Sequence, residues 1–99
     1  NIYPFSATLL LRRILMKKRI SKFWNDTYAV FLWESYTSDN VLCYKVFKAK
    51  RNEDRWCHQG KTPQFPHTPE GYKEASKLYE QMCKEMSDWI DQQIAEGEL

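Results

Sequence analysis

The longest regular pattern of hydrophobic and polar positions runs from Thr68 to the C-terminus. Its hydrophobic residues recur at spacings of three and four, which places them on one face of a helix: Tyr72, Ala75, Tyr79, Met82, Met86 and Trp89. Thr68 can cap the first free N–H groups, Pro69 suits the first helical position, and Gly97 suits the stop. We therefore expect a long amphipathic helix over residues 68–97, which needs a second layer to cover its apolar side.

The middle of the chain has the composition that is typical of strands. Residues 28–36 are rich in aromatic and branched side chains and contain no Gly or Pro. A polar turn at residues 37–40 separates them from a second predicted strand at residues 41–49. Another polar turn leads to a short third strand at residues 55–59. Together these segments predict a three-stranded antiparallel meander.

Two segments flank this meander. Residues 61–67 contain two prolines and no periodicity, so we expect a loop that leads into the long helix. Residues 7–24 have hydrophobic residues near helical spacing, among them Ile14 and Ile20, with basic residues between them. That pattern predicts a basic amphipathic helix. The expected fold is therefore α+β, in the order helix, three antiparallel strands, helix (αβββα).

The length of the chain indicates a single domain over residues 1–99, and its 42% hydrophobic content with few Gly and Pro favours an ordered one. Residues 1–15 are set apart, because Met16 would serve as a natural start. This stretch is expected either to be disordered or to be foreign to the native protein. Three cysteines without a repeated spacing do not indicate a disulfide framework, so we expect a reducing, cytoplasmic location. No apolar run is long enough to span a membrane, and no membrane partner is expected.

Strand alternation leaves bulky side chains on both faces of the predicted sheet. Either helices cover both faces, or one face exposes rings such as Phe31, Trp33, Phe47 and Trp56. An exposed patch of that kind would mark a surface for a partner or for nucleic acid.

Candidate catalytic or metal-binding chemistry is sparse. Cys57 and His58, with His67 and Cys43, form the cluster most similar to a metal site, but the paired ligands that structural zinc needs are missing. Neighbouring strand residues point to opposite faces, so Cys57 and His58 cannot form a nucleophile pair. A pair of His67 with Cys57 or with Cys43 stays open. The carboxylates fall in a turn and on the outer face of the long helix. We expect no metal, no cofactor and no enzymatic activity.

Charge is distributed unevenly behind a net value of +2. Residues 1–24 hold six basic residues and no acid, whereas residues 69–99 hold three lysines and eight acids. More basic residues follow the second and third strands, beside Phe47 and Trp56. Cations interleaved with rings suit phosphate neutralisation and base stacking. The residues predicted to bind nucleic acid are therefore Arg12, Arg13, Lys17, Lys18, Arg19, Lys45, Lys48, Lys50, Arg51, Arg55, Lys61, Phe47 and Trp56.

Other interpretations of the same residues stay open. The basic segment at residues 7–24 could be neutralised by the acidic C-terminal helix within the fold, and the strand lysines could serve solubility alone. The alternative function is a protein–protein interaction or inhibitor module, including a homodimer, that docks through the long helix and the aromatic sheet face.

The predicted order of elements, over roughly residues 7–95, is similar to that of the double-stranded-RNA-binding domain. That family's Gly-Pro-x-His motif is missing, and residues 68–71 (TPEG) stand where the family has a lysine cluster. Residues 65–72 (FPHTPEGY), followed by Ala75 and Tyr79, resemble DNA-binding modules of the integrase arm type, which combine three strands with a helix. Both are resemblances of topology, and topology alone does not give function.

Overall fold

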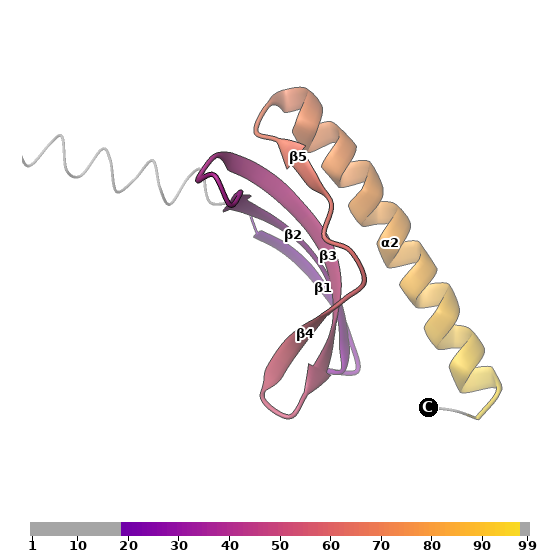
Figure 1. The fold of residues 1–99 in the computed structure, drawn as a ribbon. Coiled ribbons are helices and arrows are strands. Elements are labelled where there is room, and N and C mark those ends of the chain that lie inside the picture. Colours follow the sequence, from indigo (N-terminus) through magenta and orange to yellow (C-terminus); the bar gives the residue numbers. More distant parts are fainter. Residues whose placement is uncertain (1–18, 98–99) are drawn as a thin grey trace, which may run out of the picture.

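The computed structural model describes residues 19–97, which form one curved antiparallel sheet with a long helix along one side (Figure 1). The α+β class predicted from the sequence is confirmed. The elements are β1 (Arg19–Trp24), β2 (Tyr28–Tyr36), β3 (Leu42–Asn52), β4 (Arg55–Gln59), β5 (Gln64–Pro66) and α2 (Pro69–Ala95).

The sheet is organised around β3, its longest strand. The strands follow the order β1-β2-β3-β4, and β5 also pairs with β3. Residues 48–52 of β3 pair with β4, whereas residues 43–45 pair with β5, so these two short strands share one edge of β3. The β2–β3 register places Leu32 opposite Val46 on one face and Phe31 opposite Phe47 on the other.

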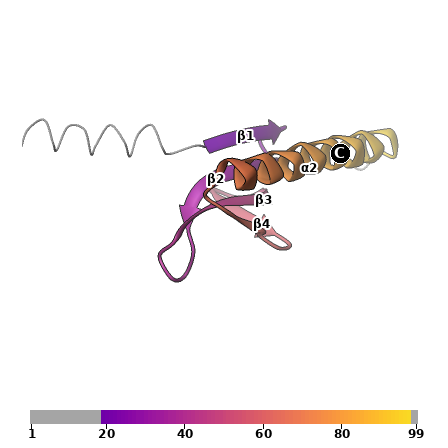
Figure 2. The same cartoon turned by 90° about the horizontal axis from the view of Figure 1, so that it is seen from above.

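Helix α2 begins and packs as its sequence predicts. The Thr68 hydroxyl accepts a hydrogen bond of 2.9 Å from the Gly71 N–H, and Pro69 occupies the first helical turn. Ala75 is fully buried against Leu32 and Val46, and seen from above α2 lies between β1 and β4 (Figure 2). The apolar stripe and one face of the sheet therefore form a common core.

Two ionisable side chains of α2 are affected by burial between the helix and the sheet. Burial raises the pKa of the Tyr79 hydroxyl to about 12, and burial also raises the pKa of the Cys83 thiol. Both groups are therefore neutral near pH 7. A small change of pH around this value is not expected to change the packing of α2 on the sheet through their ionisation. Within residues 19–97, no helix has the length and hydrophobicity that crossing a lipid bilayer requires.

The predicted N-terminal helix is wrong for residues 19–24, which form β1. Their side chains alternate between the two faces of the sheet: Ile20 and Trp24 share the face of α2, and Phe23 lies on the other. All six residues pair with β2, and this ladder satisfies backbone groups that a helix would have bonded internally. Residues 7–18 lie outside the described residues.

The predicted number of strands is also corrected, because part of the expected loop at residues 61–67 is the strand β5. Its Pro66 has no N–H to donate, which an edge strand tolerates. The carbonyl of Pro63 accepts a hydrogen bond of 3.2 Å from the Val46 N–H, just before β5 begins. Strand β3 runs three residues beyond its predicted end, to Asn52, because Glu53 adopts the left-handed backbone of a tight turn (φ 58°).

Candidate nucleic-acid interface

The sheet has a second face, opposite α2, that no other helix or strand within residues 19–97 covers (Figures 1 and 2). We call it the open face. The strand register assigns to it a continuous group of rings and small residues from β1 to β4: Phe23, Ala29, Phe31, Trp33, Phe47, Ala49, Trp56 and His58. Sequence alternation had left two options, and the structure shows that the helix covers one face only.

The rings of the open face form two layers. Phe31 and Phe47 make the inner layer, with exposed fractions of 5% and 4% and ring centroids 5.1 Å apart. Trp33 packs beside both, at 5.0 Å from Phe31 and 5.3 Å from Phe47. The buried Ala29 and Ala49 complete this cluster. The inner rings therefore form a packed base for the rings above them.

The outer layer presents aromatic surface to solvent. Phe23 is 51% exposed, and its ring centroid lies 5.5 Å from that of Trp56. The His58 ring stacks on Phe47, with 4.1 Å between ring centroids, and its Nδ1 lies 3.2 Å from the Thr62 hydroxyl. Strands β1 and β4 thus hold solvent-accessible rings over one apolar base.

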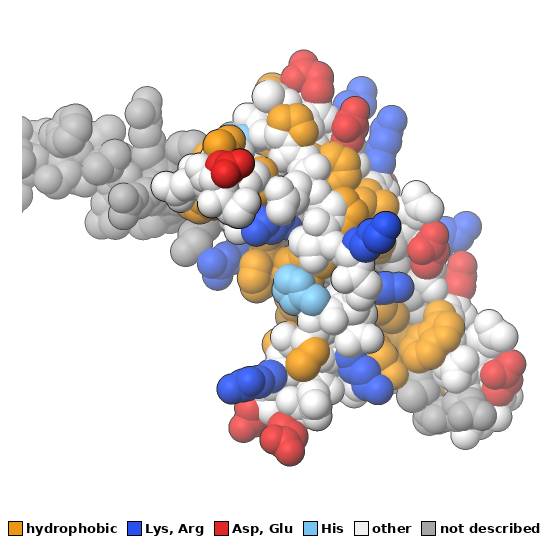
Figure 3. All heavy atoms as spheres, in the orientation of Figure 1, with side chains coloured by type: hydrophobic (Ala, Val, Ile, Leu, Met, Phe, Trp, Pro, Cys, Tyr) orange, Lys and Arg blue, Asp and Glu red, His pale blue; other side chains and the backbone are white. Residues whose placement is uncertain are grey.

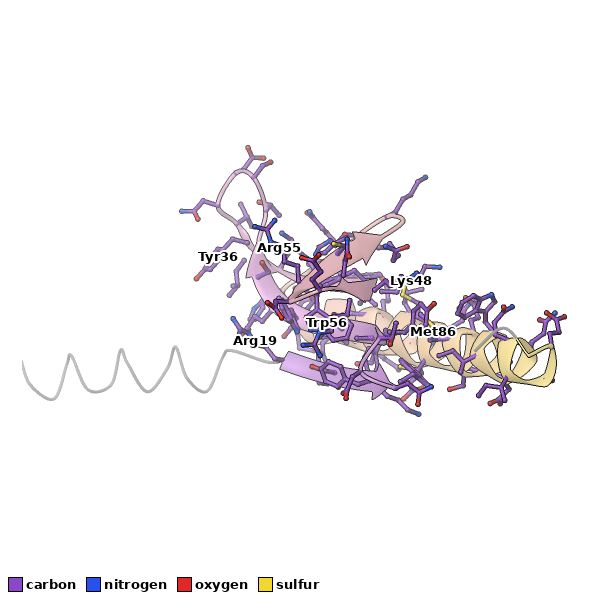
Figure 4. All side chains as sticks on the ribbon, turned by 90° about the horizontal axis from the view of Figure 1, so that it is seen from below. Arg19, Tyr36, Lys48, Arg55, Trp56 and Met86 are labelled. Atoms are coloured by element: carbon purple, nitrogen blue, oxygen red, sulfur yellow. The ribbon has the colours of Figure 1, made fainter. Side chains whose placement is uncertain are left out.

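Basic side chains border these rings. The Arg19 guanidinium lies 5.0 Å from the centroid of the Trp33 ring, and Lys45 is the cross-strand partner of the same residue. Arg51 is the cross-strand partner of Trp56. Figure 4 shows Arg19 and Trp56 on the same side of the sheet, and in Figure 3 Lys and Arg side chains lie around exposed hydrophobic ones.

The strand positions of the open face carry no carboxylate. Besides the rings, the alanines and the three cations, the register assigns to it only Ser21, Ser35, Cys43, Gln64 and Pro66. The charged side chains at the strand positions of this face are therefore all basic, while the acids of α2 lie on the other side of the sheet.

The structure divides the residues predicted to bind nucleic acid. It places Arg19, Lys45, Arg51, Phe47 and Trp56 on the open face. Phe47 lies under His58, so it supports other rings and has no free face of its own.

Other predicted residues lie elsewhere. Lys50 extends over the Tyr28 ring on the side of α2, and Lys48 lies on that side too, close to Met86 in Figure 4. Arg55 alternates with Trp56 along β4, at the end of the hairpin, and Lys61 lies in the loop before β5. The N-terminal members of the set lie outside the described residues: Arg12, Arg13, Lys17 and Lys18.

Sequence reasoning did not include Phe23, Trp33 or His58 among the nucleic-acid-binding residues, although it named Trp33 as one of the rings that an uncovered sheet face would expose. Phe23 was assigned to a helix, and His58 was weighed only as a metal ligand or a catalytic base. The signal that identifies His58 is its alternation with Trp56 in β4. The indole N–H of Trp33 is buried and has no hydrogen-bond partner among the described residues.

The clusters considered for metal or nucleophile chemistry have other partners. Within residues 19–97 no group of three or more His, Cys, Asp or Glu side chains is placed to hold a metal ion. His67 pairs with the Glu34 carboxylate and stacks on Tyr44, with ring centroids 4.7 Å apart. Cys43 is buried, and Cys57 is exposed on the face of β4 opposite His58.

No protein-family model matches the chain, no curated protein is significantly similar to it in sequence, and no solved structure matches its fold. The assignment of a function therefore depends on the geometry of the open face.

Proposed function

We propose that this protein binds single-stranded nucleic acid on the open face without catalysing a reaction. The observation that carries the proposal is the combination of solvent-accessible rings on β1 and β4, three bordering cations and no carboxylate at any strand position of that face. Bases would stack on Trp56, Phe23 and His58, while Arg19, Lys45 and Arg51 would neutralise phosphates.

The shape of the site favours single strands over a duplex. Rings that lie on a sheet can stack only with bases whose faces are free, and in a duplex those faces are already stacked on neighbouring bases. Antiparallel sheets with surface aromatic residues use this mode of recognition in single-stranded RNA binding. The ring pair Phe23–Trp56, with 5.5 Å between centroids, is fixed from below by Phe31, which contacts both rings.

The same rings could instead bind a protein, but the charges favour a polyanion. Lysine is depleted at protein interfaces, whereas the open face places Lys45 across from Trp33 and carries no carboxylate at a strand position. A cation on an aromatic surface suits nucleic acid, because guanidinium groups both neutralise phosphate and stack on bases.

The test is the affinity of the protein for a fluorescein-labelled single-stranded oligonucleotide of about ten nucleotides, measured by fluorescence anisotropy. Trp56→Ala is expected to weaken binding by about 1–3 kcal/mol, or roughly 5- to 150-fold, because one stacked base loses its partner. Trp89→Ala removes an equally large ring that is 42% exposed on α2, and it is expected to leave the affinity unchanged. Equal losses in the two variants would contradict the proposed site.

Salt dependence tests the role of the bordering cations in the same assay. With about three phosphates neutralised, the logarithm of the association constant is expected to fall with a slope of about −2 against the logarithm of salt concentration. Lys45→Ala should reduce this slope by about 0.7, whereas Lys77→Ala, which removes an exposed lysine of α2, should not change it. A slope near zero for the unsubstituted protein would overturn the proposal.

A further inference from the structure

We propose that the protein forms a symmetric dimer in which the C-terminal half of α2 from one copy docks into a groove beside α2 of the other. The groove lies between that half of α2 and strands β2, β3 and β4, on the side of the sheet opposite the open face. This inference does not depend on nucleic-acid binding, because none of the residues that carry it lies on the open face.

The C-terminal half of α2 has two flanks, and one of them is bonded to β1. The Trp24 indole N–H donates a hydrogen bond of 3.1 Å to the Ser87 hydroxyl, which ties the helix to β1. Cys83 and Ile90 are buried on that flank, one helical turn to either side of Ser87. The opposite flank borders a pocket between α2 and the sheet.

The unfilled space has a volume of about 360 Å³ and two distinct walls. Met82, Met86 and Trp89 form an apolar wall on α2, and the sheet wall is lined by Tyr28, Lys48 and Gln59. Tyr28 and Trp89 make a ring contact across one end of the groove, with 5.3 Å between ring centroids. Among residues 19–97 it is the only ring–ring contact that crosses the groove. Figure 3 shows hydrophobic side chains exposed between α2 and β4, and Figure 4 shows Met86 and Lys48 on its two sides.

The two walls also carry opposite charges. Glu85 lines the groove from α2, and Lys48 lines it from β3. In the described residues these two groups form no ion pair with each other; Glu85 accepts a hydrogen bond of 3.0 Å from the Gln81 side chain instead. Glu85 and Lys48 are therefore both available to pair with an opposite charge. In a dimer, Lys48 of a second copy would supply that charge to Glu85, and Glu85 of the second copy would supply it to Lys48.

A dimer with a two-fold axis would pair the charged residues of both walls at once. In an isologous contact, if Glu85 of one copy meets Lys48 of the other, the reverse pair forms as well. The apolar wall of each helix then covers that of its partner, including Trp89, which is 42% exposed in one chain. Met82 and Met86 of this wall can adapt to such a contact, because methionine has several rotatable bonds and a polarisable sulfur.

The acidic residues of the helix argue against nucleic acid as the occupant. Asp88 and Asp91 are exposed on the outer side of the same segment, so a polyanion would be repelled there. A second copy offers Lys48 and, next to it on the same face, Lys50. Charge complementarity thus selects a second copy of this chain.

The experiment measures the mass of the protein in solution by sedimentation equilibrium at several concentrations. The unsubstituted protein is expected to form a species of twice the 11.9 kDa of one chain. Glu85→Lys and Lys48→Glu should each raise the dimer dissociation constant by about tenfold or more, because each places two pairs of like charges in the interface. Asp91→Lys reverses a charge of the same helix outside the groove and should leave the dimer intact.

Mixing the two variants distinguishes a contact between copies from one within a copy. An equimolar mixture of Glu85→Lys and Lys48→Glu is expected to recover the dimer, since opposite charges then face each other at both positions of a heterodimer. Trp89→Ala should also weaken the dimer, whereas Trp56→Ala should not. A monomer at all concentrations, a dimer insensitive to all three groove variants, or a mixture that stays monomeric would overturn the proposal.

Discussion

Leu32→Ala is expected to lower the free energy of unfolding by about 2–5 kcal/mol. Leu32 is fully buried in β2, where it packs with Val46 of β3 and Ala75 of α2. The substitution removes a branched side chain from the contact between the helix and the sheet and leaves a cavity that backbone hydrogen bonds of β2 prevent from closing. The loss is a large part of the roughly 5–15 kcal/mol that stabilises a typical domain. Urea denaturation followed by tryptophan fluorescence measures it.

Val41→Ala is the matched control, because it also shortens a branched side chain but at an exposed position just before β3. Its effect is expected to stay within about 0.5 kcal/mol. If both variants lost the same stability, the core between α2 and the sheet would not be where the structure places it.

Gly71→Ala is expected to destabilise the protein by about 3 kcal/mol or more. A Cβ atom at this position would lie 1.9 Å from the Pro66 carbonyl oxygen, far inside van der Waals contact. The Cβ atom would be fixed to the backbone of the first turn of α2, and the atom it meets belongs to the backbone at the end of β5. No side-chain rotation can therefore relieve the overlap. The first turn must move away from β5, which also breaks the 2.9 Å bond between the Gly71 N–H and Thr68. Thermal and urea denaturation both report this change.

Lys73→Ala, two residues further along the helix and exposed, serves as its control and should change stability by less than about 0.5 kcal/mol. Because the open face lies on the other side of the sheet, the fraction of Gly71→Ala protein that stays folded is expected to keep its affinity for the oligonucleotide. A stable Gly71→Ala variant would show that α2 does not approach β5 as closely as described.

Sequence patterns predicted those elements whose pattern has a single interpretation. Strand β2 has the predicted bounds, and α2 begins next to the predicted cap at Thr68, because a composition of branched and aromatic residues and an apolar stripe each favour one structure. Strand β1 was missed because Ile14, Ile20 and nearby rings fit helical spacing, while the alternation within residues 19–24 is short. Strand β5 was missed because its three residues contain a proline and are held by pairing with distant residues of β3.

The candidate site was only partly predictable for a related reason. Alternation identifies which residues share a face of a strand, and it grouped Phe31 with Trp33 and Phe47 with Lys45. It does not show which face a helix will cover, since that depends on how α2 is placed by contacts that are distant in sequence. Alternation also separates Lys48 and Lys50 from Lys45, although a list of basic residues treats the three alike.

The central claim is that single-stranded nucleic acid binds on the open face, and the four tryptophans of the chain provide a direct measurement of it. Trp33 and Trp56 lie on the open face, whereas Trp24 and Trp89 lie on the side of α2. In a titration followed by nuclear magnetic resonance of the indole N–H signals, the oligonucleotide is expected to shift those of Trp33 and Trp56 and to leave the other two in place. Shifts confined to Trp24 and Trp89, or no shift at millimolar oligonucleotide, would contradict the claim.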